Sequence, residues 1–146
     1  MKIVSHRGNL NGRNPEQEND PSYIQAAIDA GYDVEIDVWY INEKYYLGHD
    51  HPQYSVPLSW LKERIGMLWC HAKNDDALAN MLECGIHCFW HEADKFTITS
   101  KGVPWCYPKN YIRGGITVVF DDAVNGFLPT DIFGVCTDNP INWRTV

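Results

Sequence analysis

Histidines and carboxylates that could carry out acid–base or metal chemistry recur at short intervals along the chain. His6 precedes Arg7, Glu35 and Asp37 stand two positions apart, and His49 precedes an aspartate. Imidazole titrates near neutrality and can both remove and supply a proton, whereas neighbouring carboxylates are typical ligands of a divalent metal ion. These residue types together indicate metal-assisted acid–base chemistry.

Two cations near these groups indicate an anionic ligand. Arg7 carries a planar fork of N–H donors that fits phosphate oxygens, and Lys73 supplies a second positive charge. We therefore expect a phosphoryl group to bind at Arg7 and Lys73, with His6 and His49 as the acid–base pair.

The spacing of Glu35 and Asp37 predicts that both side chains point to the same face of a strand, because alternate residues share a face. Val34, Ile36 and Val38 alternate with them, so helices covering the apolar face would leave the carboxylates inside the protein. Two buried carboxylates resist ionisation unless a cation lies between them. The sequence favours one divalent ion here; the alternative is a structural pairing. Oxygen ligands favour Mg²⁺ or Ca²⁺, and an added histidine would favour Mn²⁺ or Zn²⁺.

Two strand–helix units are predicted in the first half of the chain. One helix begins at Asp20-Pro21, where the aspartate can cap free N–H groups, and ends at Gly31. The second begins at Asn74 or Asp75 and ends at Gly85. The strands predicted beside them are residues 2–5, 33–40, 45–48, 67–70 and 86–90.

The second half is expected to add strands at 96–99, 103–106, 116–120 and 132–136 without a convincing amphipathic helix. Alternating strands and helices predict a parallel sheet. We therefore expect one domain over residues 1–146, built as a reduced or incomplete TIM-type β/α barrel with few helices in its C-terminal half. Five of the six histidines follow predicted strands, with His87 inside one, so they should meet at one rim.

Six segments in family order resemble the glycerophosphodiester phosphodiesterase family. They are SHRGN at 5–9, QENDP at 17–21, AIDAGYD at 27–33, VEIDVW at 34–39, LGHD at 47–50 and GVCTDNP at 134–140. The resemblance implies a metal-dependent hydrolase of small phosphodiesters in lipid metabolism. It implies acid–base roles for His6 and His49, metal ligation by Glu35 and Asp37, and a supporting role for Glu18. It also implies that Arg7 contacts the phosphate.

The chain departs from this family at the third metal ligand. The family has a carboxylate two residues before a lysine, whereas this chain has His71 before Lys73. We expect His71 to ligate the metal; in the alternative, water and substrate complete the coordination. Residues 90–108 have no family counterpart, and there His91 either supports the metal site or belongs to a packed loop.

Composition limits the classes of partner. The net charge of −7 argues against nucleic-acid binding, and no apolar stretch is long enough to span a membrane. The five cysteines form no CxxC pair, so we expect reduced, structural thiols in a cytoplasmic protein. A barrel with few covering helices makes a homo-oligomer possible.

Two other functions fit the same residues. One is a degenerate barrel that binds a phosphorylated ligand without cleaving it. The other is a metallo-hydrolase with two ions, whose ligands would be His6, His49, His51, His71 and His91.

Overall fold

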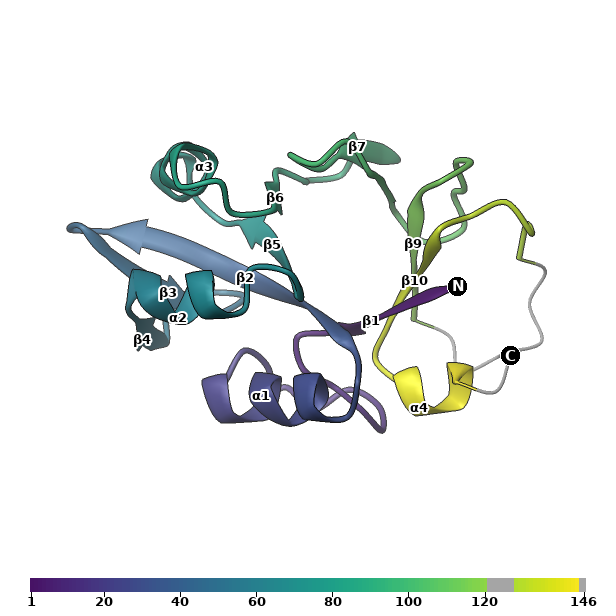
Figure 1. Cartoon of the computed structure of the whole chain (residues 1–146), viewed down its shortest axis with the longest axis horizontal. Coiled ribbons are helices and arrows are strands. Elements are labelled where there is room, and N and C mark those ends of the chain that lie inside the picture. The colour runs from purple at the N-terminus through teal and green to yellow at the C-terminus, as the bar shows by residue number, and fades with distance from the viewer. Residues whose placement is uncertain (121–127, 145–146) are drawn as a thin grey trace.

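Ten strands form one mixed sheet in the computed structural model, which describes residues 1–120 and 128–144. The strands are β1 (Lys2–His6), β2 (Asp33–Ile41), β3 (Lys44–Leu47), β4 (Tyr54–Val56), β5 (Leu68–Ala72), β6 (Cys88–Phe89), β7 (Phe96–Ile98), β8 (Pro104–Cys106), β9 (Ile116–Val119) and β10 (Gly134–Thr137). The helices are α1 (Pro21–Asp29), α2 (Leu58–Glu63), α3 (Asp75–Glu83) and α4 (Pro140–Trp143). Figure 1 shows how these elements are arranged.

The sheet runs in the order β4-β3-β2-β1-β10-β9-β8-β7, and β5 and β6 branch from β2. Strands β1, β2, β5, β6, β8, β9 and β10 pair in parallel. Antiparallel pairing attaches β3 and β4 at one end and β7 at the other. The carboxyl ends of the parallel strands therefore lie along one edge.

The predicted TIM-type β/α barrel is wrong. The sheet path has ends at β4 and β7, three of its pairings are antiparallel, and in the described part of the chain β6 and β7 form no strand pairing. Among the helices of the described residues, α1 and α3 alone reach nine residues. One cause is the turn at Asn42 and Glu43, whose φ angles of 51° and 64° suit a tight hairpin that returns β3 alongside β2.

The first two helices predicted from capping residues are confirmed. The Asp20 side chain accepts a hydrogen bond from the Ser22 N–H at the start of α1, and Asn74 accepts one from the Ala77 N–H at the start of α3. The expected strands are present with ends shifted by a few residues, and β6 is only two residues long. The short elements β4, α2 and α4 were not predicted.

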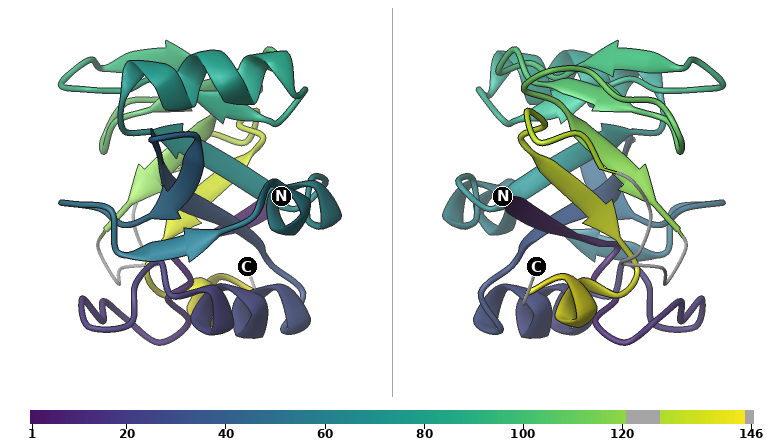
Figure 2. Two further views of the ribbon diagram at one scale, coloured as in Figure 1. Left: turned by 90° about the vertical axis from the view of Figure 1, so that its left-hand side faces the viewer. Right: turned by 90° about the vertical axis from the view of Figure 1, so that its right-hand side faces the viewer.

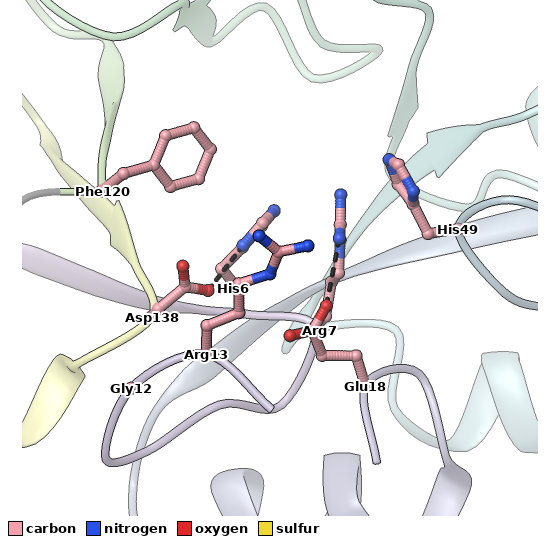
Figure 3. A pocket seen from close by; sticks show the side chains of 8 residues that line it. All are labelled: His6, Arg7, Gly12, Arg13, Glu18, His49, Phe120 and Asp138. Atoms are coloured by element: carbon pink, nitrogen blue, oxygen red, sulfur yellow. Dashed lines mark hydrogen bonds and ion pairs between the residues drawn. The ribbon is translucent and has the colours of Figure 1, made fainter. Parts of the chain in front are cut away.

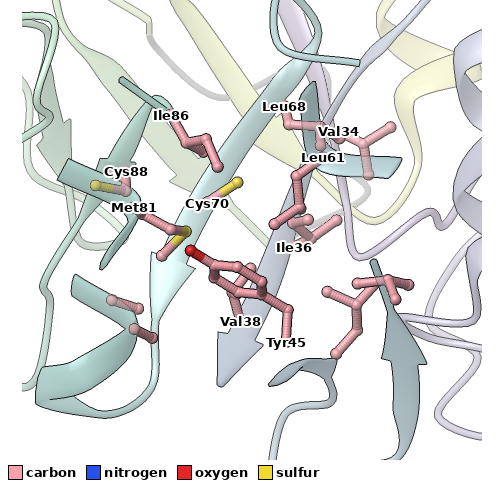
Figure 4. Close-up of a cluster of buried hydrophobic side chains, with 14 of the residues drawn as sticks. Val34, Ile36, Val38, Tyr45, Leu61, Leu68, Cys70, Met81, Ile86 and Cys88 are labelled. Atoms are coloured by element: carbon pink, nitrogen blue, oxygen red, sulfur yellow. The ribbon is translucent and has the colours of Figure 1, made fainter. Parts of the chain in front are cut away.

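One face of β2 carries the main hydrophobic core. Val34, Ile36 and Val38 are fully buried and pack in one cluster with residues of α1, α2 and α3. Figure 4 shows these side chains converging with Cys70 and Met81. This face is therefore sealed, and the alternate residues of β2 must point to the other side of the sheet.

The opposite face holds a smaller apolar cluster beneath a polar layer. The cluster comprises Val4, Trp69, Phe89, Trp105, Ile116, Val118 and Cys136. Three polar side chains stand two positions beyond members of this cluster: His6 after Val4, His71 after Trp69 and Asp138 after Cys136. Strand alternation therefore places these polar groups together above the small cluster.

Two expectations from composition have partial structural support. In the described part of the chain, no helix is long and apolar enough to cross a membrane. The five cysteines are free thiols, and four of them are buried. Whether the chain forms oligomers stays a prediction.

His87 lies directly before β6 rather than inside a strand, and it ties β6 to the loop after β7. It is 6% exposed, and its ring centroid lies 4.4 Å from that of Trp69. Its Nε2 lies 2.7 Å from Thr99 Oγ1, which itself accepts the Val103 N–H. Thr99 Oγ1 thus links the His87 ring to the Val103 N–H. Burial, with a smaller effect from Lys101, lowers the pKa of His87 from 6.5 to about 4.

Because this pKa is depressed, the folded state binds fewer protons than the unfolded chain between pH 6.5 and about 4. His87 therefore contributes stability at neutral pH that is lost as the pH falls through this window. We expect His87→Gln to lose less free energy of unfolding than wild type between about pH 7 and about pH 5, measured by urea unfolding. His51→Gln, at an exposed position, is the control. Equal losses in wild type and His87→Gln would contradict this role.

Candidate functional site

Glu35, Asp37 and His71 form a group that could hold a metal ion. Glu35 and Asp37 are 3% and 0% exposed, and His71 on β5 stands opposite Asp37 in the register with β2. One ligand atom from each residue lies within 4.8 Å of the other two. In the part of the chain that the structure describes, this is the one such group of three.

Two carboxylate oxygens of this group are buried without a hydrogen-bond partner. They are Glu35 Oε2 and Asp37 Oδ1. The other oxygen of Asp37 accepts the Asn19 amide at 2.9 Å and lies 3.2 Å from Arg7 Nε. A buried carboxylate oxygen without a partner is costly, so its natural partner is a cation placed between the two acids.

The hydrogen bond made by His71 leaves its second ring nitrogen facing this position. Its Nε2 lies 2.9 Å from the His91 carbonyl oxygen, which can only accept, so Nε2 carries a proton. In the neutral tautomer Nδ1 then has a lone pair, and it lies 3.3 Å from Asp37 Oδ1. Metal-ligating histidines typically donate their other N–H to a carbonyl in this way. The donor set therefore fits a metal ion.

The two carboxylates have opposite pKa shifts. Burial and the charge of Asp37 raise the pKa of Glu35, and His6 opposes this only partly. Burial alone would also raise the pKa of Asp37. Without a metal ion, a protonated His71 that donates from Nδ1, together with Arg7, outweighs burial and holds this pKa well below its ordinary value. A metal ion would take the place of that Nδ1 proton. The protein's own cations thus stabilise one negative charge fully and leave the second carboxylate under-compensated.

His6 forms a hydrogen-bonded pair with Asp138. Its Nδ1 lies 2.7 Å from Asp138 Oδ1, and its Nε2 lies 3.7 Å from Glu35 Oε2. Because the carboxylate accepts at Nδ1, the neutral ring keeps Nε2 as the proton acceptor. Burial lowers the pKa of His6, but Asp138 and Glu35 outweigh it and raise the net value. This pair resembles the carboxylate-oriented histidine of many hydrolytic sites.

Glu18 holds the side chain of Arg7 beside the two carboxylates of the site. Arg7 Nη1 donates to Glu18 Oε1 at 3.1 Å, and the second oxygen of Glu18 accepts from the Asn9 side chain and from the Asn14 N–H. Arg7 has a φ of 59°, a left-handed conformation in which its N–H bonds the Glu35 carbonyl. These contacts fix the guanidinium beside the carboxylates, as expected for Glu18 in its supporting role.

His49 reaches the site by a route that differs from the expected one. Its strand, β3, is antiparallel to β2 and so does not end at the rim of the parallel strands. Instead, Gly48 leaves β3 beside Asp37 and donates its N–H to the Asp37 carbonyl. A Cβ at Gly48 would lie 2.0 Å from the His51 carbonyl oxygen, so this tight turn requires glycine. His49 itself bonds Asp50 at 2.8 Å and is 43% exposed.

Two adjoining cavities meet at this site. One, here called the arginine cavity, has a volume of about 530 Å³ and contains Arg7, Arg13, Glu18 and Asp138 in its lining. The other, here called the aromatic cavity, has a volume of about 240 Å³ and includes Glu35 and His71. Both cavities are lined by His6, Arg7, His49 and Phe120. Figure 3 shows His49 across the arginine cavity from Asp138 and Phe120.

His91 lines the aromatic cavity, and its side chain is 9% exposed. Neither ring nitrogen has a hydrogen-bond partner, and Asp94 lies 3.8 Å from Nδ1. Burial and the neighbouring His71 lower the pKa of His91. Through its carbonyl group, His91 also accepts the hydrogen bond that orients His71. It is therefore part of the site, as one of the two expectations for it required.

Two residues considered from the sequence lie apart from this centre. Lys73 is not among the described residues that line either cavity, although its charge helps to lower the pKa of His49 after burial and Arg7. His51 is exposed and lines neither cavity. The arrangement of the described residues therefore does not favour the two-ion site with five histidine ligands.

Three residues of the site had no role assigned from sequence. Asp138 lies in the segment 134–140, and its pairing with His6 could have been found from the parallel neighbours β1 and β10. Asn19 anchors Asp37, and Phe120 packs 5.3 Å from the His6 ring. No periodic signal in the sequence marks either of these two.

No protein-family model, curated protein or solved structure matches the chain, so the site is interpreted from its own geometry.

We expect the wild-type chain to bind a divalent cation and to unfold at a higher temperature in its presence. At a concentration about 100 times the dissociation constant, the ion should add about 2.7 kcal/mol to the free energy of unfolding. Glu35→Gln and His71→Ala should each weaken binding by a factor on the order of 10² or more, measured by calorimetric titration. Glu43→Gln, an exposed acid, is the matched control. Unchanged affinity in both site variants would rule out this ligand group.

Proposed function

We propose that this protein is a metal-dependent phosphodiester hydrolase. The observation that carries the proposal is the contact between two kinds of group: the orphaned oxygens of Glu35 and Asp37, and the Asp138-oriented His6 beside them. Arg7 lines the same cavities and supplies a cation for an anionic ligand. A metal position, an acid–base histidine and an arginine together suit the hydrolysis of a phosphate ester.

Glu35, Asp37 and His71 would hold one divalent ion. Mg²⁺ or Ca²⁺ suits the two carboxylates, whereas Mn²⁺ or Zn²⁺ gains from the imidazole ligand. When bound, the ion would polarise a non-bridging phosphate oxygen and offset its charge. Arg7, which Glu18 fixes in place, would contact a second non-bridging oxygen.

His6 and His49 are the proposed acid–base pair, because both line both cavities and so face the same ligand. One imidazole takes the proton of the attacking hydroxyl group, and the other gives a proton to the leaving alkoxide. Asp138 holds the His6 ring in one tautomer and one orientation. The ring therefore does not have to reorient during the reaction.

The resemblance to glycerophosphodiester phosphodiesterases supports the same reaction class. Of the residues in the segments that carry it, His6, Arg7, Glu18, Glu35 and His49 line one or both cavities. In this chain His71 stands where the family has its third metal-binding carboxylate, and the His71 Nδ1 faces Asp37. A neutral imidazole in place of a carboxylate makes the set of three ligands less negative by one charge. This ligand set favours a metal that accepts nitrogen ligands.

The most direct experiment is a metal-supplemented screen of small phosphodiesters, with a phosphomonoester as the negative substrate. Hydrolysis of a diester that depends on the added ion supports the proposal. Binding of the diesters without turnover under every metal would instead support the non-catalytic, ligand-binding alternative.

His6→Ala and His49→Ala should each lower kcat for the best diester by a factor on the order of 10²–10⁴, because each removes one proton-transfer group. Steady-state kinetics on the folded, metal-loaded variants measures this. His51→Ala is the matched control, since that histidine lies outside both cavities. Near-normal kcat in either site variant would remove that histidine from the pair.

Asp138→Asn should lower kcat by a factor on the order of 10² or more, because an amide N–H would face Nδ1 and favour the wrong tautomer. The ¹⁵N chemical shifts of the His6 ring should then show the proton moving to Nε2. A purely structural role for Asp138 predicts a loss of stability with an unchanged tautomer. That result would exclude Asp138 as the positioning residue.

A further inference from the structure

Aromatic side chains form one wall of the aromatic cavity, which Glu35 and His71 also line. Phe89 and Trp105 stack with centroids 4.7 Å apart, and both are 2% exposed. Tyr107 and Phe120, which are 48% and 52% exposed, stand at the rim of the same cavity. A polyol group would meet few hydrogen-bonding partners on this wall, whereas a flat apolar ring would bury its faces there.

Within this wall, His91 supplies a buried polar ring without a hydrogen-bond partner, and Asp94 is 3.8 Å from its Nδ1. Both of its ring nitrogens lack a hydrogen-bond partner, although the side chain is 9% exposed. Its ring lies 5.9 Å from that of Tyr107, with the planes inclined by 53°. A buried ring nitrogen without a hydrogen-bond partner is costly, so a ligand group that forms a hydrogen bond with it gains affinity.

The second cavity differs in character. Phe120 is the one aromatic side chain, apart from the shared histidines, that lines it among the described residues. Gly12 and Arg13 line it in addition, and Glu18 and Asp138 add acceptors. The residues common to both cavities include His6, Arg7 and His49, which are the groups proposed to hold and cleave the phosphate. A phosphate at these shared residues would direct its two ester groups into two chemically different cavities.

We propose that the aromatic cavity takes an ester group bearing an aromatic ring with a hydrogen-bonding ring atom, and that His91 selects for that atom. The placement of the phosphate at the shared residues rests on the proposed function. The ring lies against Phe89, Trp105 and Tyr107, and its heteroatom bonds a ring nitrogen of His91. The polar ester group then occupies the arginine cavity.

Equilibrium binding tests this without requiring turnover. The probes are ethyl phosphate, benzyl phosphate and pyridin-3-ylmethyl phosphate, titrated calorimetrically into the metal-loaded chain. We expect benzyl phosphate to bind about tenfold or more tightly than ethyl phosphate, because a phenyl ring replaces a methyl group in an apolar site. The pyridine nitrogen should add a further factor of about three to ten through His91. Equal dissociation constants for ethyl and benzyl phosphate would overturn the proposal.

Two variants separate the wall from the hydrogen bond. His91→Phe keeps an aromatic ring and should remove the advantage of the pyridine over the benzyl ester while retaining the preference for benzyl over ethyl. Tyr107→Leu, at a half-exposed position that is tolerant of substitution, should weaken both aromatic esters and leave ethyl phosphate unchanged. A pyridine advantage that persists in His91→Phe would refute the role of His91.

Hydrolysis of the matching 2-hydroxyethyl diesters, run alongside, keeps the two proposals distinguishable. Preferential binding of the aromatic monoesters without cleavage of any diester would overturn the hydrolase and leave the aromatic subsite standing. Cleavage of all diesters with no aromatic preference in binding would do the reverse.

Discussion

The rest of the site depends on two carboxylates buried side by side on one strand face. Glu35 and Asp37 are separated from water by the sheet and by the small apolar cluster beneath them, so their charges must be balanced locally. His6 and Arg7 approach from the end of β1 and His71 approaches from β5, yet one oxygen of each acid still lacks a hydrogen-bond partner. A metal ion held by Glu35, Asp37 and His71 could supply the missing compensation. This electrostatic imbalance links the fold to its chemistry.

The sheet can keep two carboxylates buried side by side because its two faces have different roles. The face that holds Val34, Ile36 and Val38 packs against helices and supplies stability. The other face places His6, Glu35, Asp37 and His71 in adjacent register positions, with His6 opposite Glu35 and His71 opposite Asp37. Figure 2 shows α1 and α3 lying at opposite ends of the molecule. Relative positions in the site are thus set by backbone pairing, which is stiffer than a loop.

Local signals predicted much of this arrangement. Capping residues located α1 and α3, and the alternation along residues 34–38 correctly assigned the two faces of β2. The order and direction of the strands in the sheet could not be predicted in the same way, because they depend on which distant strands pair. The turn at Asn42 and Glu43 sends β3 back antiparallel, and His49 reaches the site only through the turn at Gly48. The partners of His6 and Asp37, Asp138 and Asn19, are likewise set by tertiary contacts rather than by spacing.

The pairing of β1 with β10 has a consequence for how the molecule comes into being. His6 and Asp138 are 132 residues apart in the sequence, and β1 lies between β2 and β10 in the finished sheet. During synthesis one edge of β1 stays unpaired until β10 has been made. Contacts over such separations also slow folding, because a long loop must close before they form. The nascent chain is therefore exposed to mispairing at this edge until β10 emerges, and His6 acquires its orientation only after Asp138 has arrived beside it.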